Sequence, residues 1–140
     1  MNIYQQDILD HYHHPHNQGV LVGATHRFTV ENLSCGDKVT VYLVVESERI
    51  IKAGFEAEGC VISIASASKL TDELVGKSVK EVENMQPEYM LELLGIELSS
   101  SRLKCAHISL QAAQKALAPE TFDQTGVESQ IMDAGESVAG

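Results

Sequence analysis

Residues 38–75 read KVTVYLVVESERIIKAGFEAEGCVISIASASKLTDELV, and the hydrophobic pattern changes its period within this stretch. Up to residue 57, β-branched and aromatic residues surround the turn Glu46-Ser47-Glu48, which is typical of two short antiparallel strands. After Cys60 the apolar residues follow a helical spacing as far as Gly76. The stretch therefore predicts a hairpin of strands 38–46 and 49–57 that leads directly into a helix at 61–75.

The flanking segments complete an α+β pattern. We expect an amphipathic helix at 2–14, which Pro15 ends, and a strand at 26–33 before the hairpin. Short helices are predicted at 78–84 and 87–94, and a longer one begins near residues 99–101 with a regular apolar stripe (Leu103, Ala106, Leu110, Ala113 and Leu117). This order predicts a small three-stranded antiparallel sheet with helices packed on one face.

Composition limits the domain organisation and the partners. At 140 residues, with no linker within 1–118, the chain is expected to form one domain at 1–118. Residues 119–140 predict an acidic, flexible tail with a transient helix around 127–132. The net charge of −10 argues against binding to nucleic acid. The N-terminus lacks the pattern of a secretory signal, and no apolar run reaches membrane-spanning length, so we expect a cytoplasmic protein without membrane contact.

Three cysteines, spaced C35-x24-C60-x44-C105, are the main chemical feature of the sequence. Their odd number argues against a disulfide framework, and in a reducing compartment such a set indicates metal binding or catalysis. Asp37 adds an oxygen ligand two residues after Cys35. If the third strand returns beside the second, residues 35–37 and 58–60 meet at one end, and the last helix can bring Cys105 there. We therefore predict that Cys35, Asp37, Cys60 and Cys105 bind tetrahedral zinc or a [2Fe–2S] cluster.

The local settings of the cysteines favour thiolates over packed thiols. Cys60 lies at a predicted helix start, and Cys105 lies close to cationic residues, with Arg102 and Lys104 before it. Cys105 is two positions from Leu103, so we expect it to point away from the apolar stripe of its helix. The alternative is three small apolar side chains in the core, because free cysteine is among the most buried residue types.

Four of the six histidines gather near the N-terminus, at positions 11, 13, 14 and 16. One interpretation makes them metal ligands. However, they lack the i, i+4 pair with an adjacent acid that marks a zinc-binding helix, and Pro15 interrupts them. We therefore interpret them as exposed residues at a helix end, where a positive charge complements the helix dipole.

Four segments resemble those of a known family: Tyr4…Ile8-x-Asp10-His11-Tyr12-x-x-Pro15-x-Asn17-x-Gly19, Cys35-Gly-Asp37, Gly59-Cys60-x-Ile62-Ser63-x-Ala65-Ser66-x-Ser68, and Arg102-Leu-Lys104-Cys105. They are similar to the IscU/SufU/NifU N-terminal scaffold family, in order over about residues 3–118. The resemblance implies an α+β fold with a three-stranded antiparallel sheet, and assembly of iron–sulfur clusters with sulfur from a cysteine desulfurase. It also implies that Cys35, Asp37, Cys60 and Cys105 are the cluster or zinc ligands.

Departures from the family pattern indicate a hybrid. Lys104 precedes Cys105 as in SufU-type members, where IscU-type members carry histidine, and Leu98-Ser-Ser-Ser-Arg102 replaces the Leu-Pro-Pro-Val-Lys segment that a chaperone binds in IscU systems. The span between Cys60 and Cys105 lacks the extra segment typical of SufU-type proteins, and His16 replaces the usual arginine of Pro-Arg-Asn. The chain is SufU-like at the site and IscU-like in length.

Three functions follow as hypotheses from the residues and the resemblance. The first is a non-enzymatic scaffold that holds a labile [2Fe–2S] cluster or iron for transfer to apo iron–sulfur acceptor or carrier proteins. Cys35 is the first candidate for persulfide acceptor, Cys105 the second, and Asp37 is the exchangeable ligand. The second is a zinc-dependent sulfurtransferase partner of a cysteine desulfurase. The third is a binding module with a static structural zinc ion.

Overall fold

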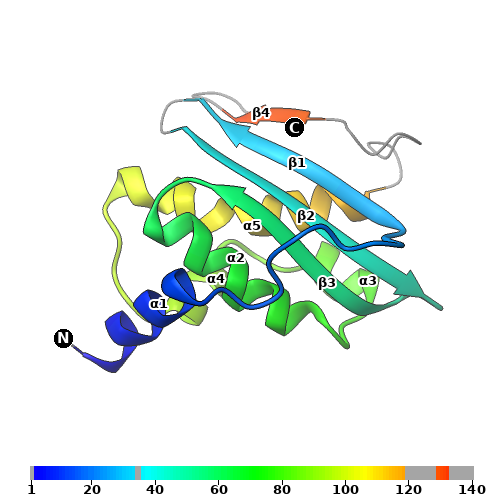
Figure 1. Cartoon of the computed structure of the whole chain (residues 1–140), viewed down its shortest axis with the longest axis horizontal. Coiled ribbons are helices and arrows are strands. Elements are labelled where there is room, and N and C mark those ends of the chain that lie inside the picture. The colour runs from blue at the N-terminus through cyan, green and yellow to red at the C-terminus, as the bar shows by residue number, and fades with distance from the viewer. Residues whose placement is uncertain (1, 34–35, 119–128, 133–140) are drawn as a thin grey trace.

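The computed structural model describes residues 2–33, 36–118 and 129–132 (Figure 1). The chain order is α1 (Ile3–His13), β1 (His26–Asn32), β2 (Asp37–Glu46), β3 (Arg49–Glu58), α2 (Val61–Leu74), α3 (Val79–Glu83), α4 (Glu88–Leu94), α5 (Ser100–Leu117) and β4 (Ser129–Met132). Local capping interactions fix the ends of several helices. Asn2 caps α1 and Ser78 caps α3, each through a reciprocal capping box. Gly95 ends α4 in the left-handed conformation.

The sheet has the strand order β3-β2-β1-β4. Antiparallel pairing of β1 with β2 and of β2 with β3 confirms the predicted three-stranded sheet. The prediction of a transient helix around 127–132 is wrong for the described part of that range. Ser129–Met132 forms a strand, which pairs in parallel with Thr29–Asn32 of β1. The edge of β1 offers main-chain groups for pairing, and a strand satisfies them where a helix cannot. The rest of the predicted flexible tail at 119–140 lies outside the described residues and stays a prediction.

The helices lie on one side of the sheet, with α2 and α5 against it (Figure 1). The inward-facing residues of the strands form one core with these two helices, and Phe28, Val41 and Phe55 are almost fully buried there. The β2–β3 register pairs Lys38 with Glu58. The start of β2 therefore lies beside the end of β3, immediately before the point at which α2 begins.

The linker between α1 and β1 runs beside the outer edge of β3 (Figure 1). Phe55 donates its main-chain N–H to the carbonyl of Asn17 over 3.0 Å, and Gly19 donates to the carbonyl of Phe55 over 2.7 Å. Gly54 permits this approach, since a Cβ there would lie 3.3 Å from the Asn17 carbonyl. The contact fixes the segment after α1 along the edge of β3. Within the described ranges, no helix has the length and apolar character needed to cross a bilayer.

Candidate metal centre

Three predicted ligands meet where the sheet joins the helices. Asp37, Cys60 and Cys105 each offer one ligand atom, and these atoms lie within 4.8 Å of one another. Asp37 is the first residue of β2, Cys60 is the N-cap of α2, and Cys105 lies in the second turn of α5. We call these three residues the cysteine cluster. Cys35 lies outside the described residues, two positions before Asp37.

The Asp37 carboxylate is held at the N-terminus of α2. The Ser63 hydroxyl donates to Oδ2 over 2.5 Å, and the Cys60 main-chain N–H donates to Oδ1 over 3.2 Å. Gly59 leaves the room for this arrangement, because a Cβ at that position would collide with Asp37 Oδ1, and its φ of +152° is one that L-residues rarely adopt. The carboxylate is therefore oriented before any ligand binds.

The two described thiols differ in acidity. Burial alone raises the pKa of Cys60, but hydrogen bonds with the side chain and main chain of Ser63, and one with Cys105, outweigh burial and lower that pKa below its usual value. Burial raises the pKa of Cys105 well above its usual value, and hydrogen bonds with Asp37 and Cys60 raise it further. The expectation that the setting of Cys105 favours a thiolate is therefore wrong.

The orientation expected for Cys105 also needs correction. Its exposed fraction is only 2%, whereas Leu103 on the expected stripe is only partly buried. The reason is that α5 packs against the sheet with one side and against α2 with another, so its buried surface is wider than a single stripe. Arg102 projects from the same helix, and a hydrogen bond with Cys60 raises the pKa of its guanidinium. A fixed positive charge therefore lies beside the half-buried thiol.

The four histidines near the N-terminus divide into two groups. His13 and His14 are exposed, in line with the predicted helix-end role. His11 is buried, which the sequence interpretation missed, and burial lowers its pKa, with a further lowering from His16. His11, His16 and Asp72 bring ligand atoms within 4.8 Å of one another, and we call these three residues the histidine cluster. His11 and His16 are five positions apart. Residues with this spacing on one helix do not share a face, so the sequence did not indicate a shared site.

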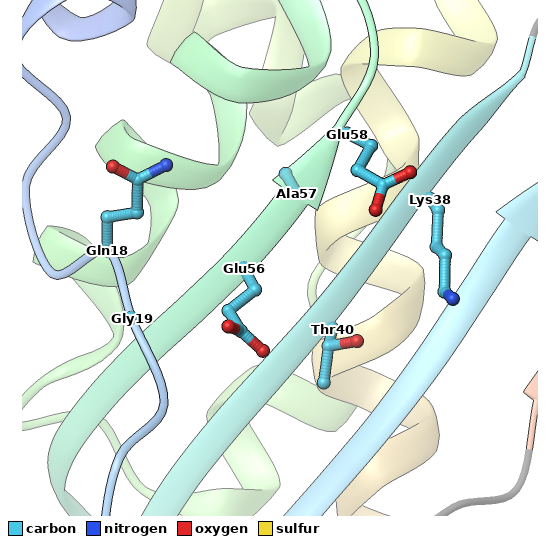
Figure 2. Close-up of a pocket in the computed structure, with 7 residues that line it drawn as sticks. All are labelled: Gln18, Gly19, Lys38, Thr40, Glu56, Ala57 and Glu58. Atoms are coloured by element: carbon cyan, nitrogen blue, oxygen red, sulfur yellow. The ribbon is translucent and has the colours of Figure 1, made fainter.

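A hollow of about 390 Å³ lies over β2 and β3 (Figure 2). Side chains from β2 and β3 and the α1–β1 linker line it: Gln18, Gly19, Lys38, Thr40, Glu56, Ala57 and Glu58. Lys38 and Glu58 adjoin Asp37 and Gly59 in the chain. Glu56 and Glu58 are the only metal-ligating side chains of this lining, and they belong to neither group of three or more candidate ligands among the described residues.

Comparisons of the sequence and the structure with known proteins find relatives of one family. Residues 3–124 match the model of the NifU-like N terminal domain. The chain is 32% identical to the "Zinc-dependent sulfurtransferase SufU" of Bacillus subtilis (strain 168), with 84% of this chain and 91% of the relative covered. It is 29% identical to the "Iron-sulfur cluster assembly scaffold protein IscU 1" of Archaeoglobus fulgidus, with 95% and 86% covered. A crystal structure of the N-terminal part of a NifU-like protein from Brucella abortus has the same fold, with a TM-score of 0.68, 20% identity and 82% and 92% covered.

Proposed function

Because the chain belongs to the NifU-like N-terminal domain family, we propose that it is an iron–sulfur cluster assembly scaffold. In this role it accepts sulfur from a cysteine desulfurase and holds a [2Fe–2S] cluster, or iron, for transfer to apo-proteins. The observation that carries the proposal is the cysteine cluster, with two thiols and a carboxylate within 4.8 Å of one another. The name of the Archaeoglobus fulgidus relative supports the same role.

The donor set suits a cargo that must be held and then released. Cys35, Cys60 and Cys105 would supply three thiolates, which are soft ligands that bind iron–sulfur clusters. Asp37 would supply a harder oxygen ligand, which soft metal centres hold less tightly. The guanidinium of Arg102, which already contacts Cys60, would offset part of the negative charge of the loaded site. Asp37 is therefore the proposed point of exchange.

Sulfur would arrive by thiol–persulfide exchange. A scaffold thiolate attacks the outer sulfur of a persulfide on the desulfurase. Cys35 is the first candidate for this thiolate, and Cys105 is the second, once its buried thiol has lost its proton. The new bond joins the scaffold sulfur to the outer sulfur, the old S–S bond breaks, and the desulfurase cysteine leaves as a thiolate. Conversion of the bound persulfide sulfur to sulfide takes two electrons, which an external thiol reductant such as dithiothreitol supplies in vitro.

A zinc-dependent sulfur acceptor is the second candidate. Two observations favour it: the similarity to the Bacillus subtilis sulfurtransferase, and Lys104 before Cys105, where IscU-type members carry histidine. Zinc in the same donor set would order the site and keep its thiolates unoxidised until the desulfurase displaces a ligand. The two candidates share residues and differ in the occupant.

The deciding experiment is metal and acid-labile sulfide analysis of protein purified without oxygen. The analysis is repeated after addition of a cysteine desulfurase, cysteine, ferrous iron and dithiothreitol. Iron and sulfide in near-equal amounts, with a visible charge-transfer band, support the scaffold. Zinc that survives this treatment while cysteine turnover by the desulfurase rises supports the sulfur acceptor. Failure to bind either metal and failure to stimulate the desulfurase would overturn both.

The Asp37→Ala variant tests the exchangeable ligand. If Asp37 is the weak ligand of a cluster held by three thiolates, the variant retains the cluster longer than the wild type when an apo-acceptor is added. The half-life of the visible charge-transfer band measures this. Loss of all metal binding in the variant, in protein that still folds by circular dichroism, would show that Asp37 is structural.

A further inference from the structure

The histidine cluster lies far from the cysteine cluster, at the other end of α2. Asp72 follows Cys60 by twelve residues, which corresponds to about 18 Å along a helix. The donors of the histidine cluster are two imidazoles and one carboxylate. They come from the end of α1, the turn after Pro15 and the last turns of α2. The His11 and His16 rings have centroids 4.4 Å apart. The role proposed for the cysteine cluster uses none of these side chains.

Ser68 orients both histidines. Its hydroxyl oxygen lies 2.6 Å from His11 Nδ1 and accepts the main-chain N–H of His16 over 2.8 Å. When Ser68 also accepts from His11 Nδ1–H, Nε2 is the basic nitrogen of that ring. Histidines that bind metals generally donate their other ring N–H in this way, which fixes the tautomer and the ring plane. In that tautomer, His11 is held as a metal-binding histidine would be.

Asp72 is oriented by a second set of contacts. Asn17 donates to Asp72 Oδ1 over 2.9 Å and to the Thr71 hydroxyl over 3.0 Å, while Asp72 Oδ2 lies 2.6 Å from His16 Nδ1. The Asn17 backbone has a φ of +63°, a left-handed conformation that turns the chain back onto α2. The side chains of His16 and Asp72 are 54% and 42% exposed, which leaves room for water at further coordination positions.

We propose that His11, His16 and Asp72 form a second metal site, which binds a divalent transition ion such as Zn²⁺ or Fe²⁺. Imidazole ligands favour these ions over Mg²⁺ and Ca²⁺, which take oxygen ligands. The ion replaces the hydrogen bond between His16 and Asp72. Bonds of about 2.1 Å place ligand atoms roughly 3–3.5 Å apart. The His16 and Asp72 atoms, now 2.6 Å apart, therefore move apart slightly, and any pair near the upper limit of 4.8 Å closes by about 1 Å or more.

The charges around the site favour a divalent cation. Asp72 contributes one negative charge, and Asp7 contributes a second, with its Oδ1 3.8 Å from His11 Nε2. Lys69 pairs with Asp7 and partly offsets it. Neutral histidines and these side chains together carry a net charge of about −1, so a bound M²⁺ leaves a total of about +1. The site joins α1 to α2, and it does not depend on what occupies the cysteine cluster.

The test is anaerobic equilibrium dialysis of the reduced wild-type protein against Co²⁺, with absorption spectra. Cobalt bound to thiolates gives an intense sulfur-to-metal charge-transfer band, whereas cobalt bound to histidine and carboxylate does not. We expect two Co²⁺ per chain, of which one gives the thiolate band. The His16→Gln variant should bind the second ion at least about tenfold more weakly, since even outer-shell changes cost 10–100-fold. It should keep the thiolate band.

Two further variants separate the outcomes. His14→Gln removes an exposed histidine outside the cluster and should bind both ions as the wild type does. Cys60→Ser should weaken only the thiolate-bound ion. A second ion that His16→Gln leaves unchanged, or that His14→Gln removes, is an adventitious ion only and overturns the proposal. The proposal is also overturned if the wild-type protein binds only one Co²⁺ and that ion gives the thiolate band. A missing thiolate band instead contradicts the function proposed for the cysteine cluster.

Discussion

The two ends of α2 carry donor sets that differ in chemistry and in burial. At its N-terminus, Asp37 and Cys105 are each 2% exposed, and the donors come from the sheet, α2 and α5. Near its C-terminus, two histidines and Asp72 meet between α1, its following turn and α2, and two of the three side chains are about half exposed. One cluster is part of the packed centre of the fold, and the other closes a surface contact.

This difference indicates two kinds of metal exchange. In the proposed scaffold site, buried thiolates would hold a soft cargo and limit access by water and oxygen, so release would depend on one weaker ligand. In the proposed second site, half-exposed imidazole and carboxylate ligands would exchange their ion with solvent and would couple that ion to the position of α1. We expect changes near Asp37 to alter the first site alone, and changes near Asp72 to alter the second alone.

The largest expected effect comes from Gly59→Ala. The new Cβ would collide with Asp37 Oδ1 and would displace the carboxylate, so we expect zinc or cobalt affinity at the cysteine cluster to fall by about 100-fold. Gly76→Ala is the control, because Gly76 also has a positive φ (+96°) but its Cβ would meet no described atom within 4 Å. Both variants should lose about 1–3 kcal/mol of unfolding free energy from backbone strain. Equal metal affinity in the two would show that the position of Asp37 does not matter.

Ser63→Ala should have the next largest effect. Its hydroxyl donates to Asp37 Oδ2, and removal of such a donor to a ligating carboxylate costs about 10–100-fold in affinity. Ser66→Ala is matched to it, since Ser66 is a buried serine of the same helix whose hydroxyl has no hydrogen-bond partner among the described residues. Competition with a zinc chelator measures both. If the two variants bind zinc equally well, Ser63 does not position a ligand.

The sequence was sufficient for the main elements of the fold. The change from period two to helical spacing at Cys60 predicts β2, β3 and α2, because alternation and helical spacing each follow from which faces are buried. The edge strand β4 was not predicted. Its pairing depends on the edge of β1, more than ninety residues earlier in the chain, and local composition carries no information about such a contact.

The two clusters differ in how far the sequence alone can predict them. Cysteine is rare and chemically specific, so Cys60, Cys105 and the nearby Asp37 stand out among the 140 residues by their chemistry. Histidine and aspartate are ordinary surface residues, and His11 meets Asp72 only because the end of α1 packs onto α2, about sixty residues later in the chain. The burial of Cys105 was missed for a related reason, since the second contact surface of α5 exists only in the folded protein.

Asp72→Asn tests the second site through stability, in a Cys60→Ser background that lacks one thiolate ligand. A ligand at 100 times its Kd stabilises a protein by about 2.7 kcal/mol, and a tenfold weaker site reduces this to about 1.4 kcal/mol. We expect the zinc-induced gain in unfolding free energy to fall by about that difference in Asp72→Asn. Asp10→Asn, an exposed carboxylate of α1, is the control. A zinc-induced gain that Asp72→Asn leaves unchanged would contradict a metal at Asp72.

Deletion of residues 119–140 should have the smallest effect on either cluster. All the described donors lie within residues 11–105, and β4 adds only four residues to the edge of β1. Because a short edge strand contributes few hydrogen bonds, each worth about 1 kcal/mol net, we expect a loss of about 1–2 kcal/mol in unfolding free energy. Cobalt stoichiometry and the thiolate band should stay at wild-type values. Loss of the thiolate band on truncation, with the histidine-bound ion retained, would instead place the boundary of the functional domain beyond Ala118 and tie the tail to the cysteine cluster alone.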